Sequence, residues 1–176
     1  MPALFLDRDG VLIESVVVDG KPYPAPDVKA VRFVPGAAQL CSTARELGFR
    51  LVCVTNQPDV ARGTTARETV EEINRFVGEK LGIEDFRVCF HDDADRCQCR
   101  KPAPGLLLAA ARDHDLDLAA SYMIGDRWKD IEAGKRAGCR TIFVDYHYDE
   151  AVKSEPDFRI SRVADARAIL QRGRQI

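Results

Sequence analysis

The sequence lacks the features that would place it in a membrane or on a secretory route. Its apolar runs stay well short of the ~18 residues that a membrane-spanning helix requires. The N-terminus shows neither the basic stretch nor the apolar segment of a signal peptide. We therefore expect a cytoplasmic protein with no membrane partner.

An excess of charge of one sign is also missing. The 26 Lys and Arg residues are balanced by 28 Asp and Glu residues, for a net charge of −2. A nucleic-acid-binding protein needs a basic field, so this balance argues against a nucleic-acid partner and favours a small soluble substrate. Repeats, low-complexity tracts and linkers are absent too, and we expect a single domain over residues 1–176 and a monomer.

Apolar runs and helical patterns alternate along the chain. Runs typical of buried strands occupy residues 3–6, 50–54, 86–90, 121–124 and 140–144. Helical spacing predicts helices near 37–47, 104–114 and 127–137, another after Thr65, whose spacing to Glu68 resembles a capping box, and a last short strand and helix in the C-terminal 20 residues. This order predicts an α/β, Rossmann-like parallel sheet with helices on both faces and ligands beyond the carboxyl ends of its strands.

Residues 14–35 interrupt this alternation. They contain four prolines, and Asp19-Gly20 follows three valines in a pattern typical of a hairpin turn. We predict a projecting flap outside the core. No cap domain is expected, because the 45 residues 10–54 and the 45 residues 56–100 are each already filled by a predicted strand and helix.

Two acidic residues, Asp7 and Asp9, directly follow the first predicted strand. Such a pair can divide the hydrolysis of a phosphate monoester: Asp7 attacks phosphorus, and Asp9 protonates the leaving oxygen and later takes a proton from water. A dianionic ester repels a carboxylate, so the reaction needs a divalent cation, and Mg²⁺ suits oxygen ligands. Alone, the pair is equally typical of a turn with solvated carboxylates.

Later positions supply the positive charge and donors that this chemistry requires. Thr55 and Asn56 follow the second strand, where they can support a phosphoryl-binding loop. Lys101 can bridge the nucleophile and the phosphoryl group. Each residue by itself also fits an ordinary loop or a surface lysine.

Asp126 and Asp130 stand at i and i+4 where a strand ends and a helix begins, so both lie on one helix face. We predict that Asp126 ligates Mg²⁺ together with Asp7 and the Asp9 carbonyl. Asp130 would hold a metal-bound water or orient Lys101. A simple helix cap is the alternative interpretation.

These four motifs, in this order and each after a predicted strand, resemble the haloacid dehalogenase (HAD) superfamily of aspartate-nucleophile phosphatases over nearly the whole chain. The resemblance implies the same roles for Asp7, Asp9, Thr55, Lys101 and Asp126. A receiver-like signalling module uses similar groups, but it accepts phosphate on a middle strand, whereas here the acidic pair follows the first strand.

Residues 89–99, which we call the Cys/His loop, contain four potential metal ligands: Cys89, His91, Cys97 and Cys99. Three thiolates and one imidazole match a tetrahedral, structural zinc site. Zinc would order a segment too polar to fold on itself and so hold Arg100 and Lys101 in place. Free cysteines near a chance histidine, or a zinc-dependent nucleic-acid module, are the alternatives.

The Cys/His loop before Arg100-Lys101-Pro102, with Asn56-Gln57 and Ala61-Arg62-Gly63, narrows the resemblance to the branch of heptose bisphosphate and histidinol phosphatases. That branch implies a sugar phosphate such as D-glycero-D-manno-heptose 1,7-bisphosphate, with Arg62 and Arg100 at its unreacted part. Histidinol phosphate and a polynucleotide remain alternatives. The sequence departs from the branch at Pro58-Asp59 and in its short Cys/His loop, which with the flap would select the substrate.

Overall fold

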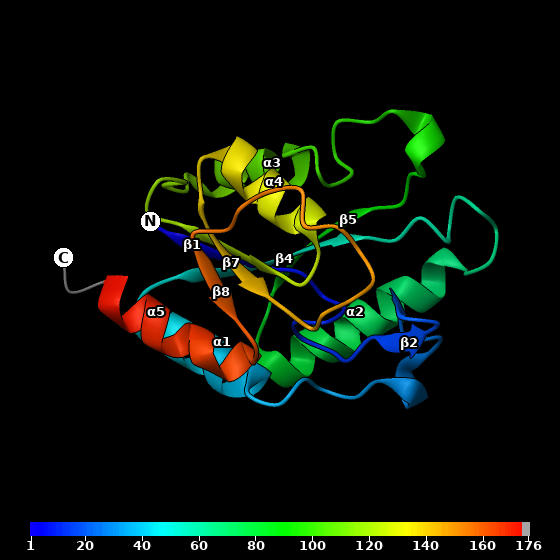
Figure 1. Ribbon diagram of the computed structural model, residues 1–176, viewed down its shortest axis with the longest axis horizontal. Helices are drawn as coiled ribbons and strands as arrows, with labels where there is room; N and C mark the ends of the chain where they lie inside the picture. The colour runs from blue at the N-terminus through cyan, green and yellow to red at the C-terminus, as the bar shows by residue number, and fades with distance from the viewer. Residues whose placement is uncertain (174–176) are drawn as a thin grey trace.

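The computed structural model describes residues 1–173, and within them one sheet of six parallel strands forms the centre of the molecule (Figure 1). In spatial order the strands are β5 (Asp85–Cys89), β4 (Arg50–Asn56), β1 (Ala3–Leu6), β6 (Tyr122–Gly125), β7 (Arg140–Val144) and β8 (Phe158–Ile160). The central strand β1 is buried along its whole length. A parallel sheet covered on both faces produces such continuous apolar strands.

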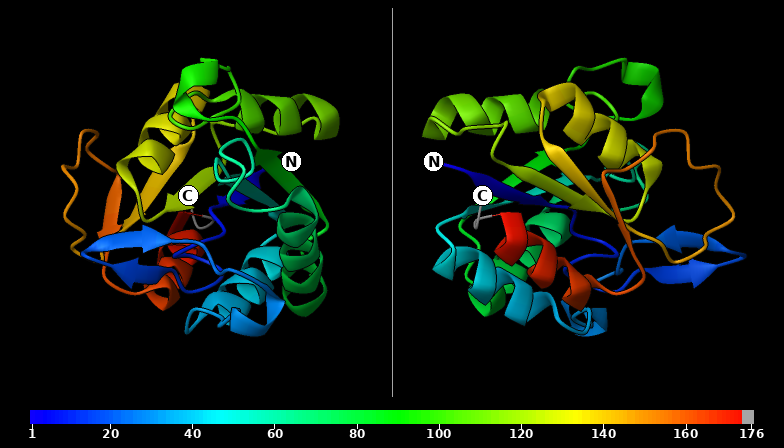
Figure 2. Two further views of the ribbon diagram at one scale, coloured as in Figure 1. Left: turned by 90° about the vertical axis from the view of Figure 1, so that its right-hand side faces the viewer. Right: turned by 60° about the vertical axis from the view of Figure 1, so that its left-hand side comes forward.

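Helices cover both faces of the sheet, as Figures 1 and 2 show. One face carries α1 (Ala37–Glu46), α2 (Arg67–Leu81) and α5 (Ala166–Gly173), and the other carries α3 (Gly105–His114) and α4 (Trp128–Ala137). Side chains alternate along β1, so Leu4 and Leu6 join the first apolar core while Ala3 and Phe5 join the second. The predicted α/β fold class is confirmed.

The predicted capping box at the start of α2 is wrong. The N-cap of this helix is Ala66, whose side chain makes no capping hydrogen bond. Thr65 lies one residue before the cap, in a compact turn in which its backbone N–H donates to the Asp59 carbonyl, 3.2 Å away. Local spacing to Glu68 did not reveal this turn, since it depends on a residue six positions upstream.

Only the first part of residues 14–35 forms the predicted projecting flap. Strands β2 (Val16–Val18) and β3 (Lys21–Tyr23) pair antiparallel and project from the molecule (Figure 2). Asp19 and Gly20 form the turn with φ of 49° and 72°, as a two-residue hairpin requires. In contrast, residues 24–35 return to the protein and bury Ala25, Val31 and Val34 in the core, because these apolar side chains fill space beside α1 and α2.

The strand order brings the predicted reactive segments to one end of the sheet. Strand β1 pairs with β4 on one side and with β6 on the other, so the residues that follow these three strands meet. Between β1 and β5 the described chain forms the hairpin, a short 3-10 helix (Val28–Ala30), α1, β4 and α2, and no cap domain. None of the helices in residues 1–173 is long and apolar enough to cross a membrane.

Candidate active site

The turn after β1 places Asp7 and Asp9 beside the end of β6. The backbone N–H of Asp7 donates to the Ile124 carbonyl at 3.0 Å. Gly10 closes the turn with φ of +89°, and a side chain there would collide with the Asp126 carboxylate. Glycine is therefore required for both its backbone conformation and the close approach of Asp126.

Lys101 lies at the centre of a buried charge cluster. Its ammonium Nζ is 3.0 Å from Asp7 Oδ1 and 2.6 Å from Asp130 Oδ1, and it donates to the Val54 carbonyl at 2.7 Å. Its side chain is only 2% exposed. Burial alone would lower the pKa of Lys101, but the carboxylates of Asp130 and Asp7 raise it, so the ammonium stays charged.

Asn56 holds the backbone of this lysine. Its Nδ2 donates to the Lys101 carbonyl at 2.9 Å, and its Oδ1 accepts from the Lys101 N–H at 3.0 Å. Both polar groups of the amide are therefore engaged. Asn56 therefore fixes the backbone of Lys101 beside the cavity, and its predicted part in binding the phosphoryl group stays a prediction.

Asp126 and Asp130 complete the acidic side of the cluster. Asp126 Oδ2 accepts from the Tyr148 hydroxyl at 3.0 Å, while its buried Oδ1 accepts no hydrogen bond from any residue the structure describes. Asp130 Oδ2 accepts from the Arg127 N–H at the start of α4, at 3.0 Å. Burial, and then the neighbouring carboxylates, raise the pKa values of Asp7 and Asp126 above their usual range.

The cluster is short of positive charge. Asp7, Asp126 and Asp130 each offer an oxygen within 4.8 Å of the others, and Lys101 is the cation that contacts Asp7 and Asp130. Buried carboxylates require partners or a metal. The unpartnered oxygen of Asp126 is therefore a fitting ligand for a divalent cation.

Thr55 and Gln57 adjoin the two carboxylates of the first turn. The Gln57 amide Nε2 donates to Asp9 Oδ2 at 2.9 Å and to the buried Thr55 hydroxyl at 2.8 Å. Arg8, which is fully buried, adds an ion pair to Asp9 at 3.0 Å and donates to Asn74 at 2.9 Å. Asp9 is thus held from two sides.

No role was predicted for Gln57, Arg8 or Tyr148. Arg8 lies between Asp7 and Asp9 and Gln57 directly follows Asn56, so their position beside predicted site residues was the available signal. Tyr148 lies in the irregular segment between β7 and β8, and no local pattern marks it. Its partner Asp126 is 22 residues away in the chain.

A cavity of about 310 Å³ opens over these groups. It is lined by Asp7, Asp9, Thr55, Asn56, Lys101, Asp126 and Asp130 and by Pro22 and Tyr23 of the hairpin. Five further charged residues that line it are exposed or half-buried, and we call them the outer cavity wall: Arg62, Asp93, Arg100, Arg127 and Lys129. The structure thus brings every predicted catalytic, phosphate-binding and magnesium-binding residue to one cavity. Their chemical roles remain predictions.

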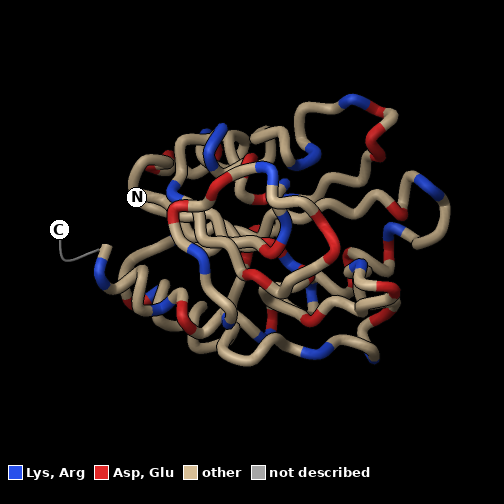
Figure 3. Tube along the Cα trace, viewed as in Figure 1, with Lys and Arg blue, Asp and Glu red and all other residues tan. Residues whose placement is uncertain are grey.

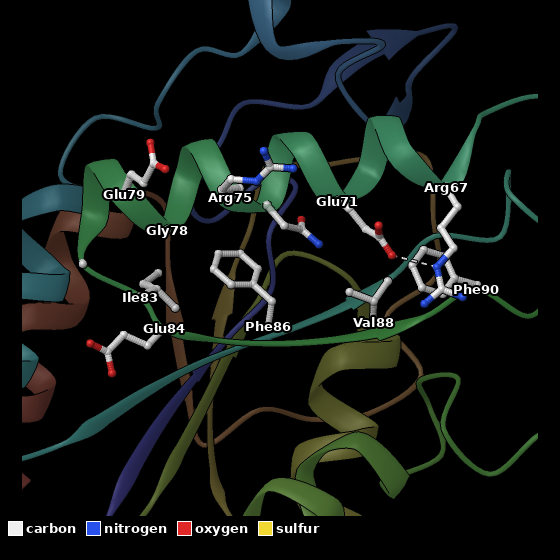
Figure 4. A pocket seen from close by; sticks show the side chains of 12 residues that line it. Arg67, Glu71, Arg75, Gly78, Glu79, Ile83, Glu84, Phe86, Val88 and Phe90 are labelled. Atoms are coloured by element: carbon white, nitrogen blue, oxygen red, sulfur yellow. Dashed lines mark hydrogen bonds and ion pairs between the residues drawn. The ribbon is translucent and has the colours of Figure 1, made fainter.

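A cavity of about 780 Å³ lies elsewhere, between α2 and β5 (Figure 4). Phe86 and Val88 point from β5 toward α2, and Arg67 pairs with Glu71 at 2.7 Å. This cavity shares no lining residue with the cavity of about 310 Å³ over Asp7. Lacking convergent buried charges among its lining residues, this larger groove is the weaker candidate for catalysis.

The four predicted ligands of the Cys/His loop come together. Cys99 Sγ lies 3.2 Å from both Cys89 Sγ and His91 Nδ1 and 3.4 Å from Cys97 Sγ. Cys89 Sγ and Cys97 Sγ are 3.7 Å apart. These separations exceed a disulfide bond of about 2.05 Å and are close to the edges of a tetrahedron of ligands around zinc.

Arg62 and Arg100 reach the cavity, but each is paired with a carboxylate of the Cys/His loop. Arg62 donates to Asp92 at 2.7 and 2.9 Å, and Arg100 donates to Asp93 Oδ1 at 2.7 Å. Lys129 also approaches Asp93 Oδ1, at 3.9 Å. Both arginines thus line the cavity beside acidic partners that no local pattern indicates, and their contact with the unreacted part of the substrate stays a prediction.

Comparisons with known proteins agree with this geometry. A family model described as "HAD-hyrolase-like" matches residues 98–166. D-glycero-beta-D-manno-heptose-1,7-bisphosphate 7-phosphatase of Yersinia pestis is 34% identical over 154 residues, which are 80% of this chain and 78% of the relative. D-glycero-D-manno-heptose-1,7-bisphosphate 7-phosphatase of Chlorobaculum tepidum is 33% identical over 92% of this chain and 88% of the relative.

A solved structure extends the likeness to three dimensions. The D,D-heptose 1.7-bisphosphate phosphatase of B. bronchiseptica, complexed with magnesium and phosphate, superposes with a TM-score of 0.80 and 27% identity over 98% of this chain and 99% of that chain. The fold, the sequence relatives and the family model point to one group. The chain therefore belongs to the HAD-like hydrolases, in the family of the heptose-1,7-bisphosphate 7-phosphatases, and is a phosphatase.

Proposed function

We propose that this phosphatase removes the C7 phosphate of D-glycero-D-manno-heptose 1,7-bisphosphate through a phosphorylated Asp7. The main support is the contact of 3.0 Å between Asp7 and the buried ammonium of Lys101, at the base of a cavity of about 310 Å³. The named activity of the relatives supports the substrate. Because the chain is a phosphatase, the receiver-like signalling module is excluded.

Magnesium is the cation that suits this site. Asp7, Asp126 and the backbone carbonyl of Asp9 would hold it, because Asp126 Oδ1 is buried without a partner among the described residues. The solved relative with magnesium and phosphate supports the same assignment. When bound, Mg²⁺ supplies positive charge that reduces the repulsion between the carboxylate nucleophile and the anionic ester.

The chain's own residues then perform two displacements. In the first, a bond forms between an Asp7 carboxylate oxygen and phosphorus while the bond from phosphorus to the sugar oxygen breaks, and Asp9 gives its proton to that oxygen. In the second, Asp9 takes a proton from water, the water oxygen bonds to phosphorus, and inorganic phosphate leaves Asp7. Lys101 and Thr55 stabilise the phosphoryl oxygens throughout.

The substrate is tested by measuring kcat/KM, with and without Mg²⁺, across heptose 1,7-bisphosphate, histidinol phosphate, other sugar phosphates and a 5′-phosphorylated oligonucleotide. We expect the heptose bisphosphate to exceed the others by roughly tenfold or more, because selective contacts to a substrate are worth that much. The cavity is lined by Asp as well as by Lys and Arg, and positions of both signs are interspersed along the chain (Figure 3), which disfavours the oligonucleotide. A higher value for histidinol phosphate would reject the proposed substrate and leave the phosphatase assignment intact.

We also propose that the Cys/His loop binds one structural zinc ion. The four ligand atoms already lie within 4.8 Å of one another, and the loop leads directly into Arg100 and Lys101. A tetrahedral ion bound by all four side chains has no open position for a substrate. Its contribution would be to order the loop and so hold Lys101 beside Asp7.

Substituting one ligand should separate this zinc site from a chance cluster. His91→Asn is expected to weaken zinc binding by at least the roughly 10–100-fold that the loss of an outer-shell partner costs. It should also lower Tm, because zinc binding energy contributes to folding. His114→Asn is the matched control, since His114 contacts Asp85 and lies outside the cluster. Zinc content by mass spectrometry and thermal unfolding provide the measurements. Equal zinc content in both variants would contradict the proposal.

A further inference from the structure

Every cation of the outer cavity wall has a carboxylate partner. Arg62 pairs with Asp92 at 2.7 Å, Arg100 with Asp93 at 2.7 Å and Arg127 with Glu150 at 2.6 Å, and Lys129 lies 3.9 Å from Asp93. These are the cations in that wall that a second anionic group on a substrate would meet. In this structure their charge is already compensated by the protein.

Asp93 differs from the other partners because its carboxylate contacts two of these cations, Arg100 and Lys129, and also lines the cavity. Its side chain is 70% exposed, whereas the Arg100 side chain that it contacts is 10% exposed. The Asp93 carboxylate therefore lies between solvent and a largely covered guanidinium. A ligand that enters the cavity from solvent meets this carboxylate together with the two cations.

The backbone around Asp93 fixes this position. Asp93 begins a short 3-10 helix (Asp93–Asp95), and Asp92 caps it by accepting from the Asp93 N–H at 2.7 Å. Asp95 returns the contact by accepting from the Asp92 N–H at 2.7 Å. The Asp93 side chain takes no part in this cap, so Asp93→Asn removes the charge without removing the capping bonds.

We propose that Asp93 is a specificity residue that competes with a second phosphate of the substrate for Arg100 and Lys129. This inference rests on the proposed function, because it assumes that the cavity receives a sugar phosphate with its reacting end at Asp7. A substrate with an uncharged distal end leaves the ion pairs in place. A bisphosphate has to displace the Asp93 carboxylate before it reaches both cations.

The expected effect is moderate, because Asp93 is exposed and its ion pairs are screened by water and salt. In Asp93→Asn, kcat/KM for heptose 1,7-bisphosphate relative to heptose 7-phosphate should rise roughly fivefold, mainly through KM. The two substrates differ only in the distal phosphate. The rise should shrink as salt is added. Asp113→Asn is the matched control, since it removes one exposed carboxylate that pairs with Arg87 on α3's side of the molecule.

An unchanged or lower ratio in Asp93→Asn, or an equal rise in Asp113→Asn, would overturn the inference. If the wild type hydrolyses neither heptose ester, the proposed substrate fails and the role of Asp93 is judged by binding. Calorimetry then compares the affinities for 1,6-hexanediol bisphosphate and hexyl phosphate, which measures the preference for a second phosphate by binding alone. A selective gain for the bisphosphate in Asp93→Asn would support the competition, and equal affinities in both proteins would reject it.

Discussion

Asp7→Asn is expected to reduce kcat by about 10⁴-fold or more, because the amide cannot form the covalent bond to phosphorus. The change is nearly isosteric, so the side chain still fits below the cavity. Burial and the neighbouring Asp130 disfavour the ionised form of Asp7. Replacing it with a neutral amide should therefore leave Tm equal to that of the wild type or higher.

Three measurements test this expectation together: kcat on the best substrate, thermal unfolding, and detection of a phosphorylated protein after acid quenching. Asp113→Asn is the matched control, since Asp113 is exposed, pairs with Arg87 and does not line the cavity. Wild type and control should form the phosphorylated protein, and Asp7→Asn should not. Retained activity in a folded Asp7→Asn protein would show that another group attacks phosphorus.

Lys101→Met is expected to lower the free energy of unfolding by about 3–5 kcal/mol, in addition to abolishing activity. Removing one partner of a buried charge pair leaves the other charge uncompensated, and that produces losses of this size. Lys101 faces both Asp7 and Asp130, whose side chains are 11% and 2% exposed. The apolar stem of methionine preserves most of the volume, so the loss reports mainly on charge.

Urea unfolding without added metal provides the measurement. Lys129→Met is the control for removing a partly exposed lysine, and its effect should stay within about 1 kcal/mol. The double variant Asp7→Asn/Lys101→Met should be more stable than Lys101→Met, because one of the orphaned carboxylates is gone. A loss below about 1 kcal/mol for Lys101→Met would mean that water or cations already compensate these carboxylates.

Pro58-Asp59, where the sequence departs from the pattern of its branch, has a clear structural role. The Asp59 carbonyl accepts from the N–H groups of Thr64 and Thr65 at 3.0 and 3.2 Å, and its carboxylate lies 3.3 Å from Arg62. The loop before α2 is thus a compact turn that presents Arg62 to the cavity. Because Arg62 also pairs with Asp92, this turn and the Cys/His loop contact each other.

Much of the fold follows from local patterns. The apolar run 3–6, the valine-rich hairpin and the apolar face of α2 each predicted an element that the structure contains. Local patterns failed where distant contacts decided the outcome. Thr65 does not cap α2, and its backbone N–H donates to the Asp59 carbonyl. Apolar side chains of residues 24–35 are buried because they pack against α1 and α2.

The sequence alone determined which groups are available for chemistry: Asp7, Thr55, Lys101 and Asp126, with the four ligands of the Cys/His loop. Asp7 and Asp126 directly follow strands as predicted, whereas Thr55 lies within the last residues of β4, which extends to Asn56. Only the tertiary structure decided their partners. It placed β1 between β4 and β6, set Lys101 against two carboxylates and brought Asp93 to the cavity. It also placed the Tyr148 hydroxyl against one oxygen of Asp126 and left the other oxygen without a partner among residues 1–173. Strand type is encoded within a few residues, whereas charge partners depend on strand order and loop paths, which no local pattern specifies.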